Sequence, residues 1–426
     1  MAQIKPFRAV YYNQGKIRSL SHVVCPPYDI ISPRKQEYFH DLDPHNFIHI
    51  DLGRDIPGEN KYSRAATIFE QWFKEEVLVR DTVPAIYFYS HQYWVNREKK
   101  VRLGFLALLK LEERKHSVFG HEHTRLEPKE DRLNLIREVK ANLSPVFVVF
   151  ADKKRLVNQL WNHHVQNLKP FIDIVDEDSN VHKVWRVTDE KILEKVRVSM
   201  EAESMFIADG HHRYEVSCTY RDEMKKKMPG FTGEEDFNYT LTYFTNIDPV
   251  GLTILPIHRL VKLDKALDID SFTLGLGDYF HVDEQKDKRK FFFMLEKAGV
   301  AEHAIGLYYG KRYWLLRLKN VKVVDKLITD KPLEYRRLDV SILNALILEK
   351  IIKGDLGENK AVSFIPDKDE LIEAVDGDET KVAFFLNPTK MDQIVSVALA
   401  GEKMPPKSTY FFPKPVSGLL INKHED

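Results

Sequence analysis

Two long apolar stretches joined by a short polar turn constrain the fold of this chain most strongly. Residues 85–95 (AIYFYSHQYWV) and 101–111 (VRLGFLALLKL) are rich in aromatic and aliphatic side chains, and the polar residues 96–100 separate them. This pattern predicts a β-hairpin. A second hairpin is predicted at 304–318, where AIGLYYG and RYWLLRL meet near Gly310. The fold must therefore contain antiparallel sheet.

The rest of the chain alternates between predicted strands and predicted helices without the regular rhythm of a doubly wound sheet. Apolar runs predict strands at 145–150, 205–208, 237–247 and 382–386. The spacing of apolar residues predicts a helix that begins at Leu156 and further helices at 211–227, 340–352 and 391–400. Because hairpins and strand–helix alternation occur together, the predicted fold class is α+β (mixed α/β), with mixed sheets and antiparallel hairpins.

The charge balance restricts the classes of partner. Lys and Arg number 64, and Asp and Glu also number 64, so the formal net charge is zero. A general nucleic-acid binder needs a surplus of cations, so we expect no nucleic-acid partner. Hydrophobic residues make up 43% and charged residues 30%, which is typical of a soluble globular protein. At 426 residues, two or three domains are expected.

The cellular setting is predicted from what the sequence lacks. Cys25 and Cys218 cannot build a disulfide framework, so reduced thiols are expected. No run of about 18 apolar residues predicts a membrane span, and residues 1–10 have no apolar core of a signal peptide. We therefore expect a cytoplasmic protein with no membrane contact. The oligomeric state is left open.

The segment 206–214 (FIADGHHRY) has the strongest local pattern for chemistry. A strand is followed by a tight turn at Gly210 and by the start of a helix. The first N–H groups of a helix have no partner inside it, and the helix dipole adds positive charge there, so this position suits a phosphate. His211 and His212 can donate hydrogen bonds, and Arg213 offers a planar fork to phosphate oxygens.

Asp209 is an unusual neighbour for an anion site. It could hold Mg²⁺ between nucleotide oxygens, or accept a proton. Alternatively, Asp209 caps the helix and the histidines are ordinary surface groups.

A second dense segment is His121-Glu122-His123-Thr124-Arg125. In an extended segment, His121 and His123 would point the same way and Glu122 would point to the other side. Three interpretations remain open. The imidazoles could bind a transition metal together with the histidines of 211–212. Glu122 could be the general base for a substrate hydroxyl, with His121, His123 or Arg125 on the substrate. The segment could also be a polar loop.

A third candidate is the loop at 403–409 (KMPPKST). Its prolines stiffen an extended backbone. Lys403 and Lys407 supply cations, and Ser408 and Thr409 supply hydroxyl groups. Such a loop can close on a phosphate or on a carboxylate, although it lacks the glycines of a P-loop. A rigid surface connection is the alternative.

Two further motifs are interpreted as structural. In Cys25-Pro26-Pro27-Tyr28-Asp29, no cation other than His22 is near Cys25 to lower its pKa, so a nucleophilic cysteine is not supported. The prolines could place Tyr28 and Asp29 at a pocket rim, but a packed turn is the preferred interpretation. The pair His258-Arg259 could add a phosphate contact, but such a pair more often ends a strand.

Several of these segments together resemble a known family. The ADGHHR element, with CPPYD at 25–29, GHEHT at 120–124, LNP at 386–388 and MPPKST at 404–409, is similar to an uncharacterised bacterial and archaeal family of about this length. This resemblance spans almost the whole chain and implies no established activity.

A more distant resemblance implies a mechanism. The Gly-His-His-Arg core is similar to the nucleotide-phosphate motif of the ParB/sulfiredoxin-like fold. Sulfiredoxins carry the reactive cysteine where this chain has His211, so sulfinic-acid reduction does not fit. Free-serine kinases of this fold keep an Asp-Gly-His core, as Asp209, Gly210 and His211 do here. The resemblance therefore implies a nucleotide-binding part at 179–260, between α/β parts at 1–178 and 261–426.

The predicted function is a phosphotransferase that uses ATP or ADP with Mg²⁺ and acts on a small hydroxyl metabolite, with free serine implied by the resemblance. Asp209, Glu122 and His211 are the predicted catalytic residues. Residues 210–213, with Lys403, Lys407, Ser408 and Thr409, are predicted to bind the nucleotide. Two alternatives remain: a ParB-like nucleotide-operated switch without catalysis, and a metal-dependent hydrolase that uses His121, His123 and Asp209.

Overall fold

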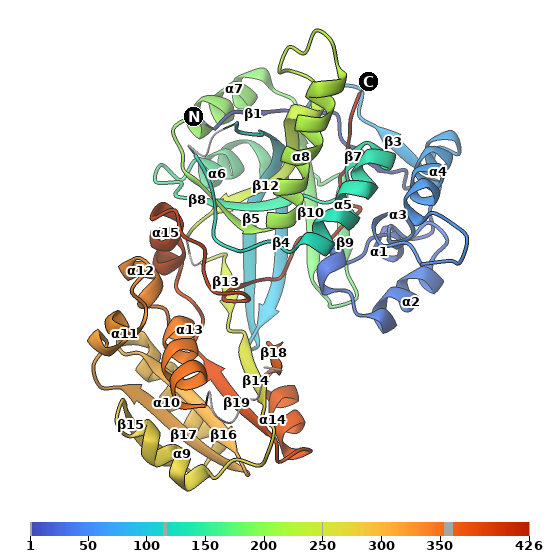
Figure 1. The fold of residues 1–426 in the computed structure, drawn as a ribbon. Helices are drawn as coiled ribbons and strands as arrows, with labels where there is room; N and C mark the ends of the chain where they lie inside the picture. Colours follow the sequence, from blue (N-terminus) through green and yellow to red (C-terminus); the bar gives the residue numbers. More distant parts are fainter. Residues whose placement is uncertain (1, 114–116, 249, 353–360, 426) are drawn as a thin grey trace. The chain divides into compact units, whose positions relative to one another are not determined.

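The computed structural model describes residues 2–113, 117–248, 250–352 and 361–425, and Figure 1 shows its elements. The chain divides into two compact units. Unit 1 comprises Met1–Gly120, Thr124–Thr253 and Pro413–Asp426, and unit 2 comprises His121–His123 and Ile254–Phe412. None of the described helices is long and apolar enough to cross a membrane.

Unit 1 is built on a nine-stranded mixed sheet with the order β6-β11-β8-β12-β5-β4-β10-β9, in which β1 also pairs with β5. The pairs β6/β11 and β8/β12 are parallel, and the other pairs are antiparallel. The strands are β1 (Ile4–Lys5), β4 (Ile86–Val95), β5 (Glu98–Lys110), β6 (Val118–Gly120), β8 (Val146–Phe150), β9 (Ile172–Val175), β10 (Val181–Val187), β11 (Met205–Asp209) and β12 (Tyr239–Asn246). Short pairs β2 (Val10–Tyr12) with β3 (Leu78–Arg80) and β7 (Ala141–Asn142) with β21 (Asn422–Lys423) lie outside this sheet.

The helices of unit 1 cover this sheet and extend beyond it. They are α1 (Leu20–Val23), α2 (Pro33–Leu42), α3 (Ile48–Asp51), α4 (Lys61–Lys74), α5 (Leu126–Val139), α6 (Leu156–Leu160), α7 (Glu190–Met200) and α8 (His211–Lys227), with single turns at Tyr28–Ile30 and Asp236–Asn238 and a π-helical turn at Trp161–Val165. The main core joins strand residues such as Val148 and Phe244 to Leu160 of α6 and Val196 of α7. Figure 1 shows α5 and α8 side by side, and Ile136 and Val216 pack between them.

Unit 2 contains a six-stranded antiparallel sheet with the order β15-β17-β16-β19-β14-β18. Its strands are β14 (His258–Lys262), β15 (Phe280–Gln285), β16 (Ala304–Tyr309), β17 (Arg312–Leu318), β18 (Ala361–Ile365) and β19 (Lys381–Leu386), and β13 (Thr253–Leu255) pairs with β20 (Tyr410–Phe412). The helices are α9 (Ile269–Leu276), α10 (Lys288–Ala301), α11 (Lys322–Leu327), α12 (Leu333–Arg336), α13 (Asp339–Ile342) continued by a π-helical stretch Leu343–Ile351, α14 (Lys368–Asp376) and α15 (Met391–Leu399). Phe291 of α10 and Leu371 of α14 pack on Phe385 in the core of this unit.

The predicted α+β fold class, with mixed sheets and antiparallel hairpins, is confirmed. Both predicted hairpins form, as β4–β5 and β16–β17. The first turn is shorter than predicted, because Val95 pairs with Glu98 and only Asn96 and Arg97 connect the strands. Both turn residues have positive φ, 50° and 67°, the backbone that matches the twist of a two-residue hairpin.

The predicted domain boundaries fall inside pairs of strands. The boundary at 178/179 lies in the turn between β9 and β10, which pair with each other, and the boundary at 260/261 lies inside β14. The strand of the DGHHR segment, β11, shares its sheet with β4 and β5. The three-part division stays a prediction, and the two compact units are the parts that the described residues form.

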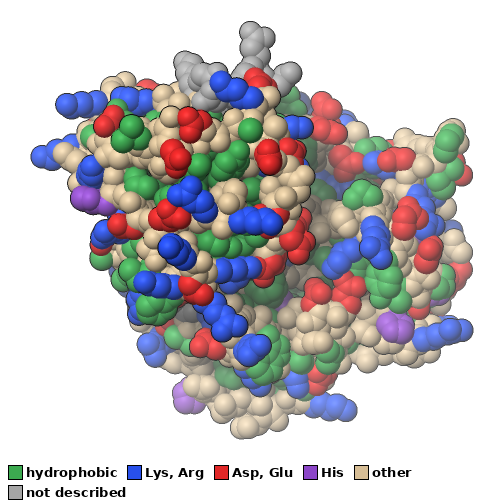
Figure 2. Space-filling model, turned by 90° about the horizontal axis from the view of Figure 1, so that it is seen from below, with side chains coloured by type: hydrophobic (Ala, Val, Ile, Leu, Met, Phe, Trp, Pro, Cys, Tyr) green, Lys and Arg blue, Asp and Glu red, His purple; other side chains and the backbone are tan. Residues whose placement is uncertain are grey.

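The surface agrees with a neutral net charge. On the face drawn in Figure 2, Lys and Arg side chains alternate with Asp and Glu side chains, and no broad basic area covers it. Charge on this face is therefore mixed over short distances, so any functional cation has to be identified by its individual contacts.

Candidate functional site

The helix α8 follows a glycine, so its N-cap residue provides no side-chain hydrogen bond to the first turn. Its N-cap is Gly210, with φ 88° and ψ 28°, a left-handed conformation that glycine adopts most easily. The first turn of α8 contains no acidic residue. The structure therefore places a tight turn and a positive helix end directly after β11, as the sequence predicts.

Asp209, the last residue of β11, does not provide the N-cap of α8. One oxygen, Oδ2, lies 2.5 Å from Nη2 of Arg213, and the other, Oδ1, lies 2.5 Å from Nζ of Lys414. Arg213 also donates from Nη1 to the carbonyl of Pro145. Asp209 thus holds two cations at the start of α8, which is a different role from the predicted alternative of a simple helix cap.

Lys414 is the cation at the centre of this cluster. Its side chain is only 8% exposed and also pairs with Asp29, whose side chain is 33% exposed. Burial opposes the charge on Lys414, but Asp209 and Asp29 outweigh it and raise the pKa of the ammonium group above its ordinary value. Lys414 is therefore a buried, permanently charged group at neutral pH.

The backbone on both sides of Lys414 is anchored. The carbonyl of Pro413 accepts a hydrogen bond of 2.7 Å from Nη2 of the fully buried Arg102. On the other side, Ser417 and Cys25 exchange two backbone hydrogen bonds. These contacts fix the position of Lys414 through the main chain, so the side chain needs little reorganisation to meet an anion.

Arg102 is itself held by an aromatic cage. Its guanidinium lies 4.6 Å from the ring centre of Phe147 and near the rings of Tyr93 and Tyr243. Nη2 also donates to Nδ1 of His91, its neighbour across β4 and β5, at 3.0 Å. The cation–π contacts offset part of the cost of burying this charge.

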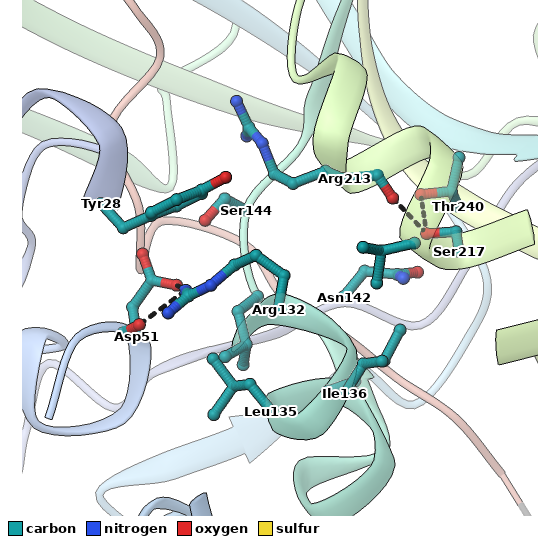
Figure 3. Close-up of a pocket in the computed structure, with 13 residues that line it drawn as sticks. Tyr28, Asp51, Arg132, Leu135, Ile136, Asn142, Ser144, Arg213, Ser217 and Thr240 are labelled. Atoms are coloured by element: carbon teal, nitrogen blue, oxygen red, sulfur yellow. Dashed lines mark hydrogen bonds and ion pairs between the residues drawn. The ribbon is translucent and has the colours of Figure 1, made fainter. Parts of the chain in front are cut away.

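A small cavity of about 50 Å³ lies beside Arg213 and Tyr28 (Figure 3). Arg132 crosses it, pairs with Asp51 at 3.0 Å and lies 4.2 Å from the ring centre of Tyr28. Burial is the main cause that raises the pKa of Tyr28 to about 12, so its hydroxyl stays protonated. Ser144 and Ser217 add hydroxyl groups to the lining. Such a space admits water or a small polar group and is too small for a nucleotide.

Arg125 and His212 are brought together in unit 1. Because β6 and β11 are parallel neighbours, the chain leaves the same edge of the sheet after Gly120 and after Asp209. The backbone N–H of Arg125 donates to Nε2 of His212 at 3.0 Å. His211 is buried. The two predicted segments are thus adjacent where they leave the sheet.

The other predicted residues lie in unit 2. Nε2 of His121 is 2.9 Å from Oγ1 of Thr409, and the carbonyl of His121 accepts from the N–H of Met404 at 2.8 Å. The 403–409 loop is therefore bound to the His121 segment, with Glu122, His123, Lys403, Lys407 and Ser408 in the same unit. The convergence of this group with Asp209 on one pocket stays a prediction.

One detail of unit 2 differs from expectation, and another agrees with the structural interpretation of His258-Arg259. His121 is buried whereas His123 is exposed, and the chain bends at Glu122 instead of running as the extended segment that the prediction assumed. Arg259 donates to the carbonyls of Pro406 and Lys407. It supports the loop from its backbone and is not directed at a phosphate.

The side chains of the candidate site give little support to a metal ion that is held there by protein ligands alone. Within the described ranges, no three His, Cys, Asp or Glu side chains converge as metal ligands. Both oxygens of Asp209 already contact cations. The predicted Mg²⁺ would have to arrive on the nucleotide phosphates, with Asp29, which has one cation partner, as the carboxylate best placed to assist.

Sequence reasoning missed Lys414 and the Asp51–Arg132 pair, and it preferred a packed turn over a functional role for Asp29. The CPPYD turn is packed, as predicted, and burial raises the pKa of the Cys25 thiol. The same turn nevertheless presents Asp29 to Lys414. A lysine between two prolines (Pro413-Lys414-Pro415) was the available signal.

The fold and the site together define a mixed α/β protein with a cluster of two carboxylates and two cations at a helix start, in which Lys414 is buried and Asp29 reaches solvent. The chain belongs to the family described as "Protein of unknown function (DUF1015)", which matches residues 4–341. None of the curated proteins matches the chain.

The solved structures to which the chain is similar match it only at low identity and low TM-score. A conserved hypothetical protein from Pyrococcus furiosus is 13% identical, with 72% of this chain and 91% of that chain covered and a TM-score of 0.33. A mutant of free serine kinase in complex with AMP is 12% identical, with 78% and 95% covered and a TM-score of 0.37. SbnI with a C-terminal truncation, from Staphylococcus aureus, is 12% identical, with 74% and 85% covered and a TM-score of 0.36. At these values no activity follows from the likeness.

Proposed function

We propose that this protein is a nucleotide-dependent phosphotransferase that acts on a small hydroxyl metabolite. The observation that carries the proposal is the position of Lys414, a buried cation between Asp29 and Asp209 at the start of α8. Phosphoryl transfer depends mainly on positioned charge. A fixed cation, a guanidinium and a helix N-terminus at one place suit that requirement.

The cations keep donors for a phosphate even while they are paired. An ammonium group has three N–H donors and a guanidinium has five. Lys414 contacts two carboxylates, and Arg213 contacts one carboxylate and one carbonyl. A phosphate can therefore approach over Gly210, where Arg213 lies, without displacing Asp209.

The roles of the remaining residues follow from their contacts. Asp209 orients Lys414 and Arg213, and His211 and His212 line the start of α8. Asp29 is the carboxylate of this cluster that reaches solvent, which makes it a candidate to accept the proton of the acceptor hydroxyl. Glu122 is the alternative base, and Lys403, Lys407, Ser408 and Thr409 are the residues of unit 2 proposed to contact the nucleotide. Mg²⁺ on the nucleotide would neutralise phosphate charge.

Free serine is the acceptor that the Asp-Gly-His resemblance implies. The test is to incubate the protein with ATP or ADP, Mg²⁺ and serine, and to measure phosphoserine by ³¹P NMR. We expect product with the unchanged protein and at least a hundredfold lower rate for Lys414→Met and Asp29→Asn. Asp189→Asn is the matched control, because Asp189 caps α7 with its side chain and touches no cation of the site.

The variants also separate the alternatives. Loss of activity in Glu122→Gln but not in Asp29→Asn would move the base to Glu122. Nucleotide binding without any product, tested with a panel of small hydroxyl compounds, would favour a non-catalytic switch. Absence of any nucleotide effect on thermal stability would refute the proposal.

A further inference from the structure

Two histidines in unit 1, outside the site described above, face each other through their ring nitrogens. His40 lies on α2 and His49 on α3, and their Nδ1 atoms are 3.1 Å apart. The rings meet edge to face, with their centres 4.6 Å apart. His40 is 8% exposed. The contact therefore joins two helices at a largely buried point.

The outer nitrogens of both rings face carbonyl oxygens. Nε2 of His40 is 3.1 Å from the carbonyl of Leu52, and Nε2 of His49 is 3.3 Å from the carbonyl of Asp43. A carbonyl oxygen only accepts, so the tautomer that satisfies both carbonyls has its hydrogen on each Nε2. A neutral imidazole has one N–H, and in this tautomer both Nδ1 atoms keep a lone pair at their contact.

An unperturbed imidazole has a pKa of about 6.5, so its neutral form predominates above that pH. Arg54 is paired with Glu37 and Asp41. In the tautomer with both hydrogens on Nε2, the two Nδ1 lone pairs repel each other unless a cation lies between them.

We propose that His40 and His49 bind a divalent transition-metal ion through their Nδ1 atoms. Neutral imidazole is a ligand for zinc, copper and nickel, whereas Mg²⁺ and Ca²⁺ take oxygen ligands. Metal-binding histidines usually donate their other N–H to a carbonyl or carboxylate, as both rings do here. In the described part of the chain no third His, Cys, Asp or Glu joins the pair, so water completes the coordination.

Such an ion would clamp α2 to α3. The turn Tyr28–Ile30, which carries Asp29, comes shortly before α2, and Asp51 is the last residue of α3. The clamp therefore connects two segments of unit 1 that carry acidic residues of the candidate site. The metal site does not depend on the proposed phosphotransferase activity.

The test is a titration of chelator-treated full-length protein with Zn²⁺ by calorimetry, and with Cu²⁺ by electron paramagnetic resonance. We expect one tight ion per chain, nitrogen couplings from two imidazoles, and at least tenfold weaker binding in His40→Gln and in His49→Gln. His163→Gln is the matched control, because His163 and His164 also neighbour each other, with ring centres 6.2 Å apart, but are exposed.

A measurement on the unchanged protein guards against variants that fail to fold. In ¹⁵N histidine spectra, Zn²⁺ is expected to shift one Nδ1 signal of each of two histidines, while their Nε2 signals keep the pattern of a protonated nitrogen. Equal Zn²⁺ binding by the unchanged protein and His40→Gln would overturn the proposal. So would a proton shared between the two Nδ1 atoms that excess Zn²⁺ does not displace.

Discussion

Lys414 in unit 1 and Lys407 in unit 2 have similar local sequences but lie in opposite environments. Both follow proline in the C-terminal stretch MPPKSTYFFPKP. Each lies beside a main-chain carbonyl that accepts from a buried arginine, Arg102 at Pro413 and Arg259 at Pro406. Lys414 is buried between two carboxylates, whereas Lys407 is exposed and has no ion pair with any described residue.

The difference shows that the anchoring of the backbone beside a lysine and the charge environment of its side chain are separate properties. A buried arginine can fix a proline-rich segment wherever carbonyls are available, since Arg259 has no carboxylate partner in the described ranges and donates only to carbonyls. Carboxylates from two separate segments, a strand end and a helical turn, are what convert an anchored lysine into a buried ion. Unit 1 supplies them as Asp209 and Asp29, and this makes Lys414 the stronger candidate for a functional cation.

The largest expected effect is on the stability of Lys414→Met compared with Lys407→Met. Removing Lys414 leaves Asp29, which reaches solvent, without its cation partner and leaves Asp209 with Arg213 alone. Breaking a fully buried pair costs about 3–5 kcal/mol, which is the upper limit here because Asp209 keeps one cation. Lys407 is exposed, so its replacement should change the free energy of unfolding by about 0.5 kcal/mol or less. Urea denaturation of both variants measures the difference. Equal losses would show that the contrast between the two lysines is wrong.

A smaller effect is expected on the stability of the protein in acid, through the buried His258 beside Arg259 of unit 2. His258 precedes Arg259, is 5% exposed, and accepts from the N–H of Leu386 through Nδ1. Burial, followed by Arg259, lowers its pKa from 6.5 to about 4. As the pH falls from 6.5 to 4, His258 becomes protonated in the unfolded chain but stays neutral in the folded protein. The folded state should therefore lose stability by up to about 3 kcal/mol from this group.

Urea denaturation at pH 7 and pH 5 tests this for the unchanged protein and for His258→Gln. The variant should lose less stability on acidification, because its amide does not titrate. His281→Gln is the control, since His281 is an exposed residue of the same unit. An identical acid response in the unchanged protein and His258→Gln would locate the acid sensitivity in unit 1, where burial also lowers the pKa of His424 to about 4.

Local patterns predicted the elements that carry the site. The helix predicted at 211–227 is α8, residue for residue, because a glycine turn and a change from strand to helical spacing mark its start. The all-apolar strand at 146–150 forms because β8 lies inside the sheet, with β11 and β12 on its two sides. The turn of the first hairpin was predicted too long, because the charged residues 98–100 continue the strand on its solvent side.

The cluster around Lys414 could not be predicted in this way. Lys414 and Asp29 are separated by 385 positions in the sequence, so no spacing rule relates them. The predicted residues of the DGHHR segment were recognisable because they are consecutive, whereas their partners come from a turn near the N-terminus and a segment near the C-terminus. Composition cannot distinguish Lys414 from Lys407, because the difference between them lies in Asp29 and Asp209, which the fold brings to Lys414 from distant segments.

The smallest expected effect distinguishes backbone strain from loss of the site. Gly210 in unit 1 and Gly401 in unit 2 both have positive φ, 88° and 74°. A Cβ at Gly210 would lie 3.0 Å from Nε of Arg213, whereas a Cβ at Gly401 would meet nothing within 4 Å. Replacement by alanine should therefore cost each position about 1–2 kcal/mol of strain, but only Gly210→Ala should displace the guanidinium that is proposed to meet phosphate.

Binding of pyrophosphate, measured by calorimetry on Gly210→Ala and Gly401→Ala, separates the two effects. We expect both variants to show similar losses in urea denaturation, with at least fivefold weaker pyrophosphate binding in Gly210→Ala alone. Because the strain is matched, a difference in binding can come only from what surrounds the glycine. Weaker binding in both variants would mean that stability, and not the approach over Gly210, controls the site. Unchanged binding in Gly210→Ala would remove Arg213 from the phosphate contact and leave Lys414 as the cation to test.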